Sequence, residues 1–124
     1  MGVLLQAARD GVDHLKLNVW HYRTIAAEVA RLEVLDAEAQ ERLELINCGE
    51  HMSAVEAQKI ADALQRTLAR VSDTDRLLLD GSVTDTPDDG TLHKEDWDRN
   101  YSTNVDMLQR FRVFCDASGG FTIY

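Results

Sequence analysis

The strongest constraint on the fold is a helix start near the middle of the chain. Ser53-Ala54-Val55-Glu56 is a capping-box sequence, in which the Ser hydroxyl and the Glu carboxylate each accept a hydrogen bond from a backbone N–H near the helix start. Six apolar residues then recur at helical spacing: Ala57, Ile60, Ala61, Leu64, Leu68 and Val71. Because a stripe of this kind is stable only when it is buried, the chain must supply other elements that cover it.

The same period predicts three more helices. The first runs over about 19–33, and Asp36 opens the second, which ends near Gly49. The short gap between these two predicts an antiparallel pair. Ser102 or Asn104 caps a last helix over about 104–116.

Three other segments are short and less regular. Residues 3–9 and 74–79 are predicted as single helical turns, the latter because it contains three consecutive leucines. Residues 80–102 are rich in turn sequences and predict either a small hairpin or an ordered loop.

The two ends of the chain show strand chemistry. Residues 13–18 alternate apolar and polar side chains, and residues 121–124 are aromatic or β-branched. We therefore expect a mainly α fold in one domain, 1–124: a small helical bundle of four to five helices with a long ordered loop. The same pattern also allows a short two-stranded sheet, in which the N- and C-terminal segments pair with each other.

The charge balance restricts the partners. The 124 residues include 22 acidic and 13 basic ones, for a formal net charge of −9. Such a chain repels phosphate backbones and anionic lipids, so we expect neither nucleic-acid nor membrane binding, while a basic protein partner fits. The two cysteines make no disulfide framework, and no secretory signal or membrane-length apolar run occurs. These features predict a cytoplasmic protein, either a monomer or a homodimer.

One stretch resembles a calcium-binding loop in part. In residues 85–96, Asp85, Asp89 and Gly90 fall at suitable positions for an EF-hand. Pro87 stands where an oxygen ligand is needed, and Asp96 replaces the bidentate Glu. We interpret the stretch as an acidic turn and expect no metal.

Two smaller groups of side chains are also weak motifs. Cys48 and His51 have the spacing of half a transition-metal site, but no second half follows. A histidine beside Asp10 and Asp13, either His14 or His21, could act as a general base. No nucleophile motif accompanies them, so we interpret these histidines as surface or capping residues and expect no cofactor.

The leading functional hypothesis is a non-enzymatic protein-interaction domain, of the inhibitor or immunity type, whose acidic surface faces a basic partner. The candidate interaction residues are those of the aspartate-rich connection: Asp88, Asp89, His93, Glu95, Asp96, Trp97, Asp98 and Tyr101. Complementary charge at such a surface mainly speeds association and sets specificity.

The alternative is a small ligand-binding protein or enzyme. Here the 80–102 loop would form a pocket with the helices, lined by Tyr101, Trp97 and Arg99, with His93 as the titrating group.

Overall fold

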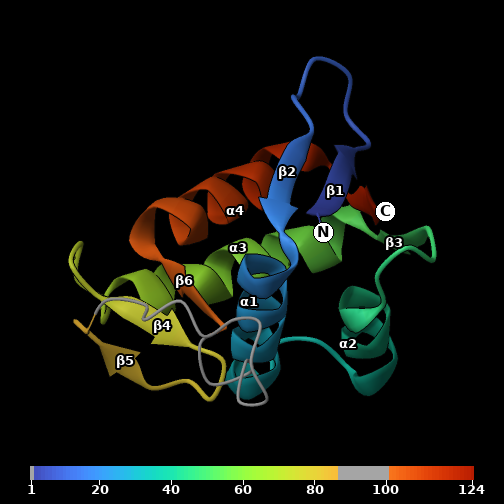
Figure 1. The fold of residues 1–124 in the computed structure, drawn as a ribbon. Coiled ribbons are helices and arrows are strands. Elements are labelled where there is room, and N and C mark those ends of the chain that lie inside the picture. Colours follow the sequence, from blue (N-terminus) through green and yellow to red (C-terminus); the bar gives the residue numbers. More distant parts are fainter. Residues whose placement is uncertain (1, 87–100) are drawn as a thin grey trace.

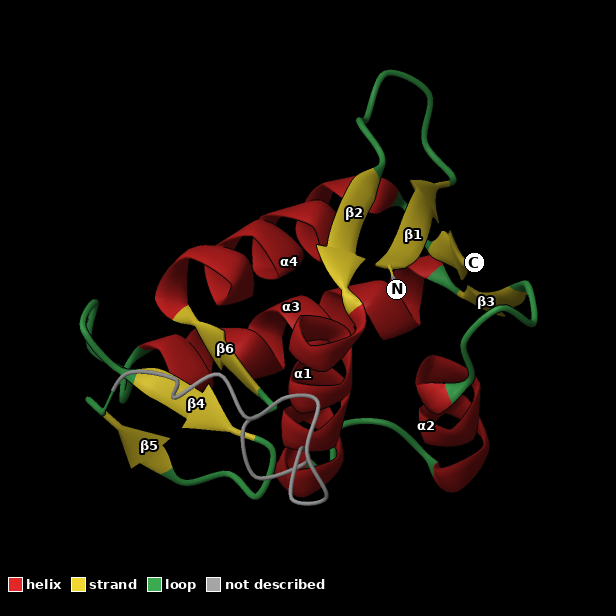
Figure 2. Cartoon of the chain, in the orientation of Figure 1, coloured by secondary structure: helices red, strands yellow, loops and turns green. Residues whose placement is uncertain are grey.

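The computed structural model describes residues 2–86 and 101–124. Within these ranges it contains four helices and seven strands arranged in two antiparallel sheets. The fold is therefore mixed α/β, and the predicted helical bundle is wrong. Figure 2 shows the two sheets at different ends of the helical layer.

The first sheet joins the two ends of the chain. Its order is β2 (Leu15–Asn18), β1 (Gly2–Ala7), β7 (Phe121–Ile123) and β3 (Glu50–Met52). The segment predicted as a helical turn is thus strand β1, which alternates buried Val3 and Leu5 with more accessible residues.

The predicted pairing of 13–18 with 121–124 is also wrong, although both segments contain strands. β1 lies between them: Leu5 is opposite Leu15 on one side and Ile123 on the other. β1 and β7 are the two inner strands, so each is paired on both edges and buries its apolar residues. Figure 1 shows β1 and β2 in front of the helices.

The helices follow the periodicity closely. They are α1 (Val19–Leu32), α2 (Ala37–Glu44), α3 (Ala54–Leu68) and α4 (Val105–Ser118). Both bonds of the predicted capping box are present at the start of α3: the Ser53 hydroxyl accepts from the Glu56 N–H at 3.1 Å, and the Glu56 carboxylate accepts from the Ser53 N–H at 2.9 Å. Helices α3 and α4 pack along each other and form most of the helical layer (Figure 1).

The second sheet lies at the other end of the helices. Its order is β5 (Val83–Thr84), β4 (Arg76–Leu78) and β6 (Ser102–Asn104). The helical turn predicted over 74–79 is wrong, since Leu77 is a buried strand residue that pairs with Val83 and Thr103. A short apolar run is compatible with either a buried strand or a helical turn. In this segment the structure is a strand because it pairs with β5 and with β6, which is distant in the sequence.

The core lies between the first sheet and the helices. Tyr22, Phe111 and Phe121 are its largest buried side chains, and the Phe111 and Phe121 rings meet edge to face with centroids 6.4 Å apart. At Gly120 the backbone has φ +104°, and an added Cβ would lie 2.8 Å from the Met52 carbonyl oxygen. Glycine at this position lets β3 approach β7.

Candidate functional site

Most of the residues predicted to form the interaction site fall outside the described part of the chain. They are Asp88, Asp89, His93, Glu95, Asp96, Trp97 and Asp98. Tyr101 is described: it is half-buried, and its carbonyl oxygen accepts from the Leu79 N–H at 3.0 Å. The calcium-loop residues after Thr86 lie outside the described residues as well.

The described residues contain a second concentration of negative charge, around α2. Residues 33–50 hold six acidic side chains and one basic one, a net charge of −5 within a chain of −9. We call these six residues the acidic α2 surface: Glu33, Asp36, Glu38, Glu41, Glu44 and Glu50. All are exposed except Glu50, which is partly exposed.

The sequence of α2 explains why its glutamates point outward. Ala39 and Leu43 are buried against the core, whereas Glu38, Glu41 and Glu44 recur every three residues on the opposite side. Asp36 caps the helix by accepting from the Ala39 N–H at 2.8 Å. The acidic face is therefore a direct consequence of the amphipathic pattern.

Two hydrogen bonds fix α2 against α1. The Tyr22 hydroxyl donates to the Leu43 carbonyl oxygen, and the Gln40 side-chain amide donates to the Ala26 carbonyl oxygen at 3.1 Å. Burial raises the pKa of Tyr22 far above its usual value, so the hydroxyl stays protonated as a donor. These two bonds hold α2, which carries three of the six acids, against α1, and Figure 1 shows the two helices.

The single basic residue of this segment is already engaged. Arg42 contacts Glu38 at 2.7 Å and Glu56 at 2.6 Å. The hydrogen bond from Arg42 is the main reason that the pKa of Glu56 falls to about 2. Within the described residues, Glu33, Glu41 and Glu44 have no ion pair, so their charge is directed to solvent.

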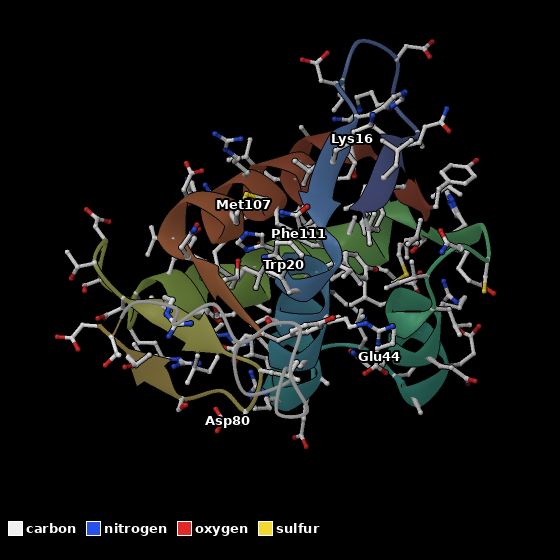
Figure 3. The ribbon with its side chains drawn as sticks, in the orientation of Figure 1. Lys16, Trp20, Glu44, Asp80, Met107 and Phe111 are labelled. Carbon is white, nitrogen blue, oxygen red and sulfur yellow. The ribbon has the colours of Figure 1, made fainter. Side chains whose placement is uncertain are left out.

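Apolar surface adjoins these carboxylates. Leu45, directly after α2, is 39% exposed. A cavity of about 200 Å³ lies between α1 and α2, with Glu44 and Arg23 among its polar residues (Figure 3 labels Glu44). Its remaining lining residues are Tyr22, Ala26, Ala27, Leu79 and Tyr101. Apolar contact area beside charge is typical of protein interfaces.

A buried carboxylate that the sequence did not reveal lies elsewhere in α1. Glu28 is 1% exposed and accepts from Thr67 at 2.6 Å, from Arg70 at 2.6 Å and from Arg31 at 2.9 Å. Burial raises the pKa of Glu28, but these hydrogen bonds outweigh burial and lower it below its usual value. All its partners belong to the protein, so Glu28 ties α1 to the end of α3.

The two weak motifs do not assemble into sites within the described residues. Cys48 and His51 are exposed, and no group of three metal-binding side chains occurs in the described ranges. Asp10, Asp13 and His14 are exposed on the connection between β1 and β2, whereas His21 contacts Thr103 through Nδ1 at 3.0 Å.

Comparison with protein-family models, with curated proteins and with solved structures found no match for this chain. In 2–86 and 101–124, no helix is both long enough and apolar enough to cross a bilayer.

Proposed function

We propose that this domain is a non-enzymatic protein-interaction module that presents the acidic α2 surface to a basic protein partner. The observation that carries the proposal is the net charge of −5 over residues 33–50: Glu38, Glu41 and Glu44 lie on the outer side of α2, whose inner side is anchored in the core, and the other three acids precede or follow that helix. An inhibitor or immunity-type role is one form of such a module.

Electrostatics supports this surface as a docking site. Its carboxylates repel one another, and Glu33, Glu41 and Glu44 are exposed and form no ion pair within the described residues, so a cationic partner gains attraction at these three without breaking an existing salt bridge. Arg42 does not offset the field, because Glu38 and Glu56 already hold it. Leu45 adds an apolar contact at the edge of the same surface.

The alternative of a ligand site built on His93 involves residues outside the described part of the chain, and it stays a prediction. The same applies to the aspartates between 88 and 98, which would extend the negative surface if they lie near α2.

The test compares two variants of equal charge change. The first combines Glu33→Gln, Glu41→Gln and Glu44→Gln, and the matched control neutralises three exposed aspartates elsewhere, Asp10→Asn, Asp13→Asn and Asp73→Asn. Each protein is used to capture partners from its host at low salt, and the affinity of a captured partner is then measured with purified proteins. Loss of three close charge contacts predicts binding weaker by at least about tenfold for the first variant only.

The partner is expected to be basic, and its affinity should fall as salt is raised. A partner that binds both variants as tightly as the wild type contradicts the proposal. So does the absence of any stoichiometric partner for the wild-type protein.

A further inference from the structure

A second hollow lies on a different part of the molecule. A cavity of about 580 Å³ forms where β1, β2, the start of α1, α4 and the connection between α2 and β3 meet. This volume is within the range of small-molecule sites, about 300–1,000 Å³. Its lining residues are Gly2, Val3, Leu4, Lys16, Leu17, Asn18, His21, Asn47, Met107 and Tyr124. None of them belongs to the acidic α2 surface.

The charge of this lining differs from that of the rest of the chain. Among the described residues that line the cavity there is no Asp or Glu, although 22 of the 124 residues are acidic. Lys16 is its cation, and in the described part of the chain its ammonium group forms no ion pair. The cavity therefore favours an anion over a cation.

Neutral hydrogen-bonding groups accompany the lysine. Asn47 lines the cavity from a left-handed backbone conformation with φ 65°. Asn18 also lines the cavity, is exposed, and its side chain makes no capping hydrogen bond to α1. Both amides can donate to an oxygen of a ligand.

His21 is the titratable group with a fixed position in this cavity. Its Nδ1 lies 3.0 Å from the Thr103 hydroxyl, which is almost fully buried and holds the ring in place. Burial lowers the pKa of His21, so the ring is neutral at neutral pH. With Nδ1 engaged by Thr103, Nε2 is the nitrogen left for a ligand.

The other walls are apolar. Val3 and Leu17 are buried, and Leu4 and Met107 are half-buried. Figure 3 shows Lys16 on β2, Met107 on α4 and Trp20 at the start of α1. A ligand with a small apolar body would contact these walls while its charged group meets the lysine.

We propose that the cavity lined by Lys16, Asn18, His21 and Asn47 binds a small organic anion, a carboxylate or a phosphate monoester with an apolar body. Lys16 provides the opposite charge, the two amides and His21 orient the anionic oxygens, and the half-buried Leu4 and Met107 contact the apolar part. This site is independent of the acidic α2 surface and of any protein partner.

The test uses the whole chain, labelled with ¹⁵N, and follows amide chemical shifts. Phenyl phosphate and benzoate are the two anionic probes, inorganic phosphate lacks the apolar body, and benzyl alcohol lacks the charge. The expected result is saturable shifts at 16–21 and 47 with at least one of the two aromatic anions, and binding weaker by about tenfold or more for phosphate and for benzyl alcohol. Tighter binding of benzoate would indicate a carboxylate ligand, and tighter binding of phenyl phosphate would indicate a phosphate ester.

The variant Lys16→Gln should weaken binding of the aromatic anion by about tenfold. Lys59→Gln is the matched control, because Lys59 is an exposed lysine on α3 that does not line the cavity, and it should leave the affinity unchanged. Both lysines are exposed, so the amide spectra should show that both variants stay folded.

Three results overturn the proposal: no saturable shift with either aromatic anion, equal binding of benzyl alcohol, or an affinity that Lys16→Gln does not alter. None of these results bears on the acidic α2 surface, whose test uses other residues and a protein partner.

Discussion

Glu28 shows how a charged side chain can serve the fold rather than a reaction. Three donors from three positions, Arg31, Thr67 and Arg70, converge on one carboxylate that is 1% exposed. Arg31 also donates to the Leu79 carbonyl oxygen at 2.9 Å, so the network extends from α1 to the segment after β4. Removing the charge of Glu28 should therefore weaken the contacts of α1 with the end of α3 and with the segment after β4.

The variant Glu28→Gln should lower the free energy of unfolding by about 2–3 kcal/mol, the usual loss for a buried carboxylate with charged hydrogen-bond partners. Urea denaturation measures this quantity. Glu41→Gln, on the exposed face of α2, is the control and should change stability by less than about 0.5 kcal/mol. Equal effects of the two substitutions would show that the Glu28 network does not stabilise the fold.

The lowered pKa of Glu56 predicts that the free energy of unfolding decreases at acid pH. Its pKa falls from 4.5 to about 2 in the folded protein, mainly because Arg42 donates to it. The folded state binds the proton less readily than the unfolded one, so the stabilisation is complete above pH 4.5 and is lost as the pH falls toward about 2.

The comparison for this prediction is Glu56→Gln, since Gln keeps the capping-box geometry and removes only the charge. The difference in unfolding free energy between wild type and variant should be constant near neutral pH and shrink at acid pH. A difference that does not change down to pH 2 would contradict the pKa shift.

Among the elements, the helices were predictable because their information is local. The stripes and caps of α1, α2, α3 and α4 can be read within a few residues of each helix, and the structure places Asp36, Ser53 and Asn104 at the predicted caps. Two strands were also predictable, since β2 and β7 lie in the segments with strand chemistry, but β3, β4 and β6 were not, because they have three residues each, too few to show a period. Their pairing partners lie far away in the sequence.

The candidate site was predictable only in part. A count of charges along the sequence is enough to find the excess of glutamates in 33–50. The sequence pattern instead favours the aspartate-rich connection as the interaction site, because that segment combines acidic residues with Trp97 and Tyr101. That Arg42 is held by Glu56 could not be predicted, since the two residues belong to different helices. The cavity at Lys16 also required the fold, because the connection from α2 to β3 and the strands meet only there.

The approach of β3 to β7 gives a prediction at the level of the element. Gly120→Ala places a methyl group 2.8 Å from the Met52 carbonyl oxygen at a backbone φ of +104°. We expect a loss of about 2–3 kcal/mol, measured by thermal unfolding. Gly11→Ala is the matched control, since Gly11 also has positive φ but no atom within 4 Å of an added Cβ, and it should lose about 1 kcal/mol. Similar losses of stability in the two variants would mean that the close approach of β3 to β7 does not require glycine at position 120.

Across the whole molecule, negative charge is distributed unevenly. Residues 33–50 hold a net charge of −5 of the chain's −9, and in the part of the chain that the structure describes no Asp or Glu lines the cavity at Lys16. The two regions suit different ligands, a basic protein and a small anion. The termini are tied into one sheet through β1 and β7, so both regions are supported by the same core (Figure 1).

Amide chemical-shift mapping shows directly whether the acidic α2 surface binds a basic partner. The ¹⁵N-labelled protein is titrated with a short lysine-rich peptide at low salt, and the shift of every amide is recorded. We expect the largest shifts to cluster in residues 33–50 and to disappear when salt is raised or when Glu33, Glu41 and Glu44 are replaced by Gln. Shifts spread evenly over all exposed acidic residues, or centred on those of 73–85, would contradict it.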